Sequence, residues 1–244
     1  MSGHSKWATI HKQKSVLDAK RGAVFTKLAR NITLAAREKG GDPEMNPSLR
    51  AAIDKAKELN MPKDNIERAI KKGTGELEGA RLEEIIYEGF GPAGAALIIK
   101  CLTDNKNRTA SNIRHILTKY GGRMGEPNSV AWMFSEFGVI RIDAEELGAH
   151  KLDRDEFELA LIDKGAEDFK TEDGEIIILS DVKNLSGVKE AVEKIGIKID
   201  SSEVEQVAKN EVEVKGDEKE KIEKLLEALD DDEDVQIVYV NVKI

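Results

Sequence analysis

The spacing of apolar residues changes near residue 80, and this change is the strongest limit on what the chain can fold into. Before that point, one apolar stripe recurs at helical spacing through Phe25, Leu28, Ile32 and Ala35. After Arg81, short apolar runs of strand length alternate with helical stretches. The pattern therefore predicts a helical N-terminal region followed by α/β units.

Residues 1–80 contain start and stop signals for three helices. Gly40-Gly41 is expected to end the first helix. Asn46-Pro47 is a good pair of N-cap and first-turn residues for the second helix. Pro62 opens the third helix, and Gly73 is expected to end it.

The elements after residue 81 have the order of two α/β units, one inside the other. Residues 130–205 read β-α-β-β-α-β, which is the order of a ferredoxin-like unit. The flanking segments supply β-β-α before it and β-α-β after it, and residues 211–214 are expected to be one of these strands. Gly138 is expected to break the strand-rich stretch 130–142.

We therefore predict an α+β fold, with an N-terminal three-helix domain followed by two ferredoxin-like α/β domains, one inserted in the other. The predicted limits are 1–80 for the basic helical domain, 81–129 plus 206–244 for the split α/β domain, and 130–205 for the inserted ferredoxin-like α/β domain.

The formal charge is unevenly distributed along the chain. The whole sequence carries −9, but residues 1–80 hold 16 Lys/Arg and 10 Asp/Glu, a net charge of +6. Residues 81–244 carry the remaining −15. A basic end on an acidic protein points to a polyanionic partner. A solvated, Lys-rich helical surface explains the same charges equally well. The acidic turn 230–233 is expected to be solvated.

No set of residues in the sequence makes an active site. The four histidines are His4, His11, His115 and His150, and all stand outside any metal-binding motif. Cys101 lies in an apolar strand and is expected to be a small buried hydrophobe. The carboxylates are scattered, so no acid and base pair is recognisable. We therefore expect a non-enzymatic protein with no metal and no cofactor.

The sequence also bears on the cellular compartment. One cysteine permits no intramolecular disulfide, and no apolar run approaches the roughly 18 residues of a membrane span. The N-terminus lacks an apolar signal core. We expect a cytoplasmic protein with no membrane contact.

The first positive signal is a basic N-terminal segment with Lys6, Trp7, His11, Lys12, Lys14, Lys20, Arg21, Lys27 and Arg30. Basic side chains neutralise phosphates and release counterions, which dominates non-specific affinity for nucleic acid. Lys20, Lys27 and Arg30 fall opposite the apolar stripe, together with Arg37. Trp7 either stacks on a base or packs on the helical domain.

Two further basic segments adjoin helix starts. One joins an apolar strand to a helix and holds Lys106, Arg108 and Arg114. Either these cations face an anion at the helix N-terminus, or the segment is a polar capping loop. The other is a turn leading into a helix, with Lys63, Arg68, Lys71 and Lys72. It is either a second nucleic-acid contact or only a helix start.

Four long motifs stand out in residues 1–140. They are Met1-Ser2-Gly3-His4-Ser5-Lys6-Trp7; Asn60-Met61-Pro62-Lys63-Asp64-Asn65 with Arg68-Ala69-Ile70-Lys71-Lys72-Gly73; Tyr87-Glu88-Gly89-Phe90-Gly91-Pro92 with Leu102-Thr103-Asp104-Asn105; and Val130-Ala131-Trp132-Met133-Phe134. These motifs resemble those of the YebC/PmpR family, and the similarity fades after residue 140. Asn31 stands where an acidic residue is common, and Asn128 where glycine is common.

The resemblance implies a helical N-terminal domain, two α/β domains and a regulator of transcription that binds DNA. It also implies an alternative, because related members, including a mitochondrial translational activator, act on translation and associate with ribosomes. Under either reading the partner is nucleic acid, as DNA or as RNA in the ribosome. The acidic α/β domains are then free to contact a protein partner.

Overall fold

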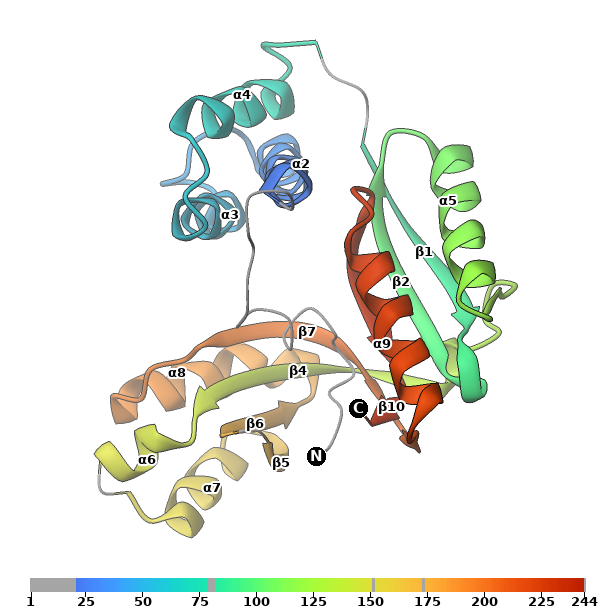
Figure 1. Cartoon of the computed structure of the whole chain (residues 1–244). Coiled ribbons are helices and arrows are strands. Elements are labelled where there is room, and N and C mark those ends of the chain that lie inside the picture. The colour runs from blue at the N-terminus through green and yellow to red at the C-terminus, as the bar shows by residue number, and fades with distance from the viewer. Residues whose placement is uncertain (1–20, 79–81, 151, 173, 244) are drawn as a thin grey trace.

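The structure is a computed structural model that describes residues 21–78, 82–150, 152–172 and 174–243, and for Arg21 only the backbone. Its helical region lies on one side of two sheet-containing units (Figure 1). Helix α2 is the helix of this region that lies toward strands β1 and β2 (Figure 1). The predicted α+β class is confirmed.

The helical region contains α2 (Arg21–Lys39), α3 (Pro47–Glu58) and α4 (Lys63–Thr74). Asn46 is fully buried and accepts a hydrogen bond from the backbone N–H of Leu49 at 3.0 Å, which caps α3 as predicted. Its side-chain amide donates to the carbonyls of Ala35 and Gly40, both at 2.8 Å. One side chain thus joins the end of α2 to the start of α3. Gly40 ends α2 with a φ of +89°, also as predicted.

Gly73 does not end α4, contrary to the sequence-based prediction. The helix continues to Thr74, and Gly75, with a φ of +82°, is the residue that caps it. A Cβ atom at Gly73 would lie 2.5 Å from the carbonyl oxygen of Thr33 on α2. The glycine is therefore needed for the close approach of two helices, and the flanking sequence gives no sign of this.

The first sheet has the antiparallel strand order β3-β1-β2-β9. Its strands are β1 (Glu83–Phe90), β2 (Ala96–Thr103), β3 (Arg123–Met124) and β9 (Val235–Val240). Helices α5 (Lys106–Lys119) and α9 (Asp217–Asp230) cover one face (Figure 1). The short 3-10 helix η2 (Pro92–Gly94) lies between β1 and β2.

Strand β3 was not predicted, and the predicted strand at 211–214 lies elsewhere. β8 (Val212–Glu213) pairs in parallel with β10 (Val242–Lys243) in a separate two-stranded sheet. β3 pairs with β1 because Gly122 lets the chain pass close to it, since a Cβ there would lie 2.4 Å from the Phe90 carbonyl oxygen.

The second sheet lies within the chain between β3 and β8 and has the antiparallel order β5-β6-β4-β7. Its elements are β4 (Phe134–Asp143), α6 (Glu145–Ala149), α7 (Arg154–Ile162), β5 (Ala166–Glu172), β6 (Glu175–Ser180), α8 (Leu185–Ile195) and β7 (Ser201–Ala208), with the 3-10 turns η3 (Ala131–Met133) and η4 (Val182–Asn184). α7 and α8 lie on one face (Figure 1). This is the predicted β-α-β-β-α-β unit, inserted in the first α/β unit; the exact residue limits of the three domains stay predictions.

Strand β4 continues through Gly138, where a break was predicted. A Cβ at Gly138 would lie 2.7 Å from the Cβ of Leu185. Because glycine has no side chain, the start of α8 can pack closely against the strand. Here too, a glycine that was expected to break an element instead allows a close contact.

The carboxylate of Glu88 holds the segment that connects the two sheets. It accepts hydrogen bonds from the backbone N–H groups of Asn128 and Val130, both at 2.6 Å, and of Ala131 at 2.9 Å. Asn128 has a φ of +66°, a conformation that glycine and asparagine tolerate better than other residues. The unusual asparagine at this position therefore fits the backbone that the segment needs.

We expect Gly73→Ala to lower the free energy of unfolding by about 1–3 kcal/mol, because the added methyl group meets backbone that cannot move freely. Gly22→Ala in α2 is the matched control, since a Cβ there meets nothing within 4 Å. It should be neutral or slightly stabilising, because alanine favours a helix. Urea unfolding followed by circular dichroism makes the comparison, and equal stabilities for the two variants would contradict the helix-contact explanation.

Candidate nucleic-acid interface

The N-terminal part of the predicted interface lies outside the described residues. This applies to Lys6, Trp7, His11, Lys12, Lys14 and Lys20, and to the side chain of Arg21. The described candidates are Lys27 and Arg30 on α2, four cations on α4, and three on α5.

The basic face of α2 contacts the first α/β unit. Lys27 Nζ donates to the backbone carbonyl of Asp230 and lies 3.1 Å from its Oδ1. Arg30 pairs with Asp234 Oδ1 at 2.6 Å. Both cationic side chains are only 14% exposed, so these charges are largely used within the protein.

Backbone carbonyls complete this contact between the helical region and the sheet. Arg30 also donates to the carbonyls of Leu102, at 3.2 Å, and Glu233. Arg37, about two turns further along α2, donates to the Leu82 carbonyl at 2.6 Å. The face of α2 opposite its apolar stripe therefore docks on the end of the first sheet.

Asp234 is the anion at the N-terminus of α5. Thr109 Oγ1 donates to its Oδ2 at 2.7 Å, and Arg108 donates to Oδ1 and Oδ2 at 3.0 and 3.1 Å. Its side chain is 3% exposed. One of the two alternatives from the sequence was that Lys106, Arg108 and Arg114 face an anion at this helix start. Of these three cations, Arg108 contacts a carboxylate of the same chain there. Asn105 also caps α5 by accepting from the Arg108 N–H at 3.1 Å, so the capping-loop alternative is present as well.

The charge of Asp234 is maintained by its neighbours. Burial by itself raises the pKa of this carboxyl group, but the hydrogen bonds from Thr109 and Arg108 and the charge of Arg30 outweigh it. The pKa of Asp234 is therefore held below its ordinary value, and the group is ionised at neutral pH.

The acidic turn 230–233 is not simply solvated, contrary to the sequence-based prediction. Asp230 pairs with Lys27, and Asp232 Oδ2 accepts a hydrogen bond from Asn112 at 3.2 Å. The cationic side chains that contact this turn belong to α2, which lies about 200 residues earlier in the chain. No local pattern could have indicated that pairing, because the partners meet only in the folded protein.

The cations of α4 are exposed. Lys63 lies 3.5 Å from Glu67 in an exposed pair. Arg68, Lys71 and Lys72 are exposed and form no ion pair among the residues that the structure describes. On α5, Lys106 pairs with Glu83 at 2.6 Å, whereas Arg114 is exposed and has no ion pair in the described ranges.

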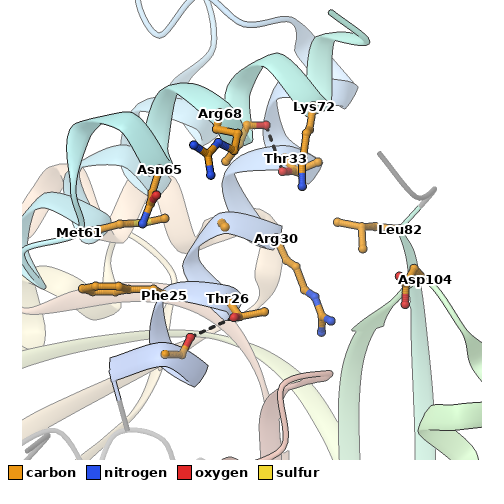
Figure 2. Close-up of a pocket in the computed structure, with 13 residues that line it drawn as sticks. Phe25, Thr26, Arg30, Thr33, Met61, Asn65, Arg68, Lys72, Leu82 and Asp104 are labelled. Atoms are coloured by element: carbon orange, nitrogen blue, oxygen red, sulfur yellow. Dashed lines mark hydrogen bonds between the residues drawn. The ribbon is translucent and has the colours of Figure 1, made fainter. Parts of the chain in front are cut away.

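A cleft of about 530 Å³ lies where α2 and α4 meet the first sheet. Arg68 and Lys72 line it from α4, Arg30 lines it from α2, and Phe25 and Met61 lie together on one side (Figure 2). The cleft thus joins two of the exposed cations to an apolar surface. The half-buried ring of Phe25, which was predicted as part of a core stripe, is one of the cleft residues that the sequence did not assign to a site.

The described residues do not assemble a group suited to a metal ion. No cluster of three or more His, Cys, Asp or Glu suited to a metal occurs among them. Cys101 is buried, and burial raises the pKa of its thiol to about 12, so it is not a thiolate at neutral pH. In the described part of the chain, no helix has the length and apolarity to cross a membrane.

Two family models match the chain. The TACO1/YebC protein N-terminal domain matches residues 5–76, and the TACO1/YebC second and third domain matches residues 82–242. A probable transcriptional regulatory protein of Thermoanaerobacter pseudethanolicus is 52% identical over 244 residues, which is 100% of this chain and 98% of that protein. Another, of Geobacter sulfurreducens, is 50% identical over 241 residues, 99% of this chain and 95% of that protein.

A solved structure shows the same fold. The crystal structure of a conserved hypothetical protein from Aquifex aeolicus matches with a TM-score of 0.80 at 42% identity, and covers 98% of this chain and 96% of that one. The likeness therefore includes the helical region and both sheets.

Asp234→Asn should weaken the contact between the helical region and the sheet. We expect a loss of about 1–3 kcal/mol in unfolding free energy, because two guanidinium groups lose their charged partner. The 44% exposure of Arg108 favours the low end of that range. Glu233→Gln is the matched control, since it removes the same charge from an exposed neighbour.

The pH dependence provides a second check on Asp234. A carboxyl group whose pKa is lowered on folding contributes stability above its unfolded pKa of about 3.9, and that contribution is lost as the pH falls through the folded value. The stability difference between wild type and Asp234→Asn should therefore be constant from neutral pH to about pH 4 and disappear in more acidic solution. A difference that persisted there would assign the effect to packing.

Proposed function

The chain belongs to the TACO1/YebC family, and from this premise we propose that it is a non-enzymatic regulator of transcription that binds DNA through its helical domain. The names of its relatives support the regulatory part of the proposal, because the proteins of Thermoanaerobacter pseudethanolicus and Geobacter sulfurreducens are called probable transcriptional regulatory proteins. The site of action that follows from this role is the cytoplasm.

The observation that carries the proposal is the unpaired basic surface of α4. Arg68, Lys71 and Lys72 are exposed, and within the described ranges they have no carboxylate partner. Cations that the protein itself does not neutralise are the ones available to phosphates. In contrast, Lys27 pairs with Asp230, and Arg30 and Arg108 pair with Asp234, so the protein itself neutralises these charges.

We propose that the phosphate-binding surface combines the α4 cations with the basic segment that precedes α2. Its cations are Lys6, Lys12, Lys14, Lys20, Arg21, Lys63, Arg68, Lys71 and Lys72. Trp7 and His11 are further contacts, and Lys106 and Arg114 on α5 are outlying ones. The role of Lys27, Arg30 and Arg108 in this proposal is structural, because their ion pairs hold the helical domain in place.

The charge of the remaining chain limits how the protein meets duplex DNA. Residues 81–244 carry a net −15 and repel a polyanion that wraps around them. Contact is then restricted to one end of the molecule, so the affinity should be modest and should fall steeply with salt.

The same acidic surface favours a second candidate function, that of an RNA- or ribosome-associated translation factor. A particle made of RNA and protein offers phosphate to the basic domain and basic protein surface to the acidic domains at the same time. Ultraviolet crosslinking in cells, followed by DNase or RNase digestion, separates the two. Material lost only to DNase, with promoter sequences recovered, supports the first function, and material lost only to RNase, with ribosomal sequences recovered, supports the second.

Removing the three α4 cations should weaken nucleic-acid binding in a salt-dependent way. For Arg68→Gln with Lys71→Gln and Lys72→Gln, we expect the slope of log affinity against log salt to fall by about two to three, one unit per lost phosphate contact. The control replaces Arg50, Lys55 and Lys57 on α3 by glutamine, because those cations pair with Glu44, Glu58 and Asp54. Fluorescence anisotropy with a labelled oligonucleotide gives both slopes, and an unchanged slope for the α4 variant would refute the assignment of this surface.

A further inference from the structure

The cleft between α2 and α4 combines a cationic surface with an apolar one. One wall is cationic, with Arg68 and Lys72 from α4 (Figure 2). The apolar side chains of Phe25 and Met61 lie together on one side of the cleft (Figure 2). The lining also includes Ala29 and Ala69, whose small side chains leave room. Its volume of about 530 Å³ is within the range of sites for small organic ligands.

Some charged side chains around the cleft are paired within the protein, and others are available to a ligand. Arg30 lies on the α2 wall, but its guanidinium is fixed by Asp234 and the Leu102 carbonyl. Asp104 lines the far side, and its carboxylate is paired with Arg108 at 2.8 Å. Arg68 and Lys72 are therefore the cations of the cleft, within the described residues, whose charge is not used by the protein.

The shape of the cleft discriminates between forms of nucleic acid. A duplex is read by an element that protrudes into a groove, and its base faces are covered by stacking. A concave site with an aromatic ring can instead accept a base that is already unstacked, while cations beside it hold the phosphate. Asn65, at the rim of the same cleft, offers an amide that can hydrogen-bond the edge of a base.

We propose that this cleft binds one unpaired nucleotide of a single-stranded nucleic acid, with the base against Phe25 and Met61 and a phosphate between Arg68 and Lys72. The proposal rests on the proposed function and adds to it a preference for unpaired strands. Single-stranded RNA and single-stranded DNA share this chemistry, so the test includes both.

The test is fluorescence anisotropy of the full-length protein with four labelled probes of equal length. They are a single-stranded RNA of mixed sequence, the DNA strand of the same sequence, the corresponding DNA duplex, and a strand of abasic DNA that has phosphates but no bases. The variants are Lys72→Gln, Lys71→Gln and Phe25→Leu. Lys71 is the control for Lys72, because it is an exposed cation on the same helix that does not line the cleft.

The cleft predicts a specific set of results. Wild type should bind a single strand more tightly than the duplex. Lys71→Gln removes a phosphate contact outside the cleft, so it should weaken binding of the single strand and of the duplex by a similar factor, whereas Lys72→Gln should weaken binding of the single strand about fivefold and affect the duplex less. Phe25→Leu keeps an apolar side chain and removes the ring, so it should weaken binding of the base-containing strand about tenfold and leave the abasic strand unaffected. Circular dichroism confirms that each variant keeps its helices.

The outcomes separate this proposal from the broader one. Equal binding of duplex and single strand, together with equal effects of Lys71→Gln and Lys72→Gln, would overturn the cleft proposal and leave the basic-surface function standing. Absence of salt-sensitive binding to every probe would overturn both. Tighter binding of the RNA strand than of the DNA strand, or the reverse, identifies which source of single strand the cleft takes.

Discussion

The contact between the helical region and the rest of the protein depends on the buried carboxylate of Asp234. Three segments meet there: α2 through Arg30, the start of α5 through Arg108 and Thr109, and β9, which Asp234 directly precedes. A buried carboxylate is costly unless several donors satisfy it, and this one has them from two parts of the chain. The position of α2 relative to the first sheet is therefore fixed by ion pairs and hydrogen bonds.

This constraint divides the basic residues of the helical region into two groups. The cations of α2 that face the sheet neutralise Asp230 and Asp234, so they contribute to the assembly of the protein. On α4, Arg68, Lys71 and Lys72 are exposed and form no ion pair among the described residues, so their charge remains available. Net charge alone could not separate the two groups, because both have the same residue types and helical spacing. Only the partners supplied by the fold make the distinction.

The sequence predicted best what depends on near neighbours. Asn46-Pro47 caps α3 as expected, since an N-cap side chain accepts a hydrogen bond from an amide two or three residues ahead. The sequence-based prediction was wrong where a glycine lies against a distant segment. Gly73 and Gly138 were expected to end or break their elements, but each allows close contact with a distant part of the chain. Likewise, the pairing of Lys27 with Asp230 spans 203 positions, and no local pattern contains it.

Arg30 links this constraint to the candidate site. It lines the cleft and at the same time pairs with Asp234, so the cleft keeps its width only while the helical region is docked. A ligand that binds the docked form must stabilise the docking of the helical region. Loss of this docking must in turn weaken ligand binding, because coupling between two equilibria is reciprocal. The pairing at Asp234 and the chemistry of the cleft are therefore energetically connected, although Asp234 itself does not line the cleft.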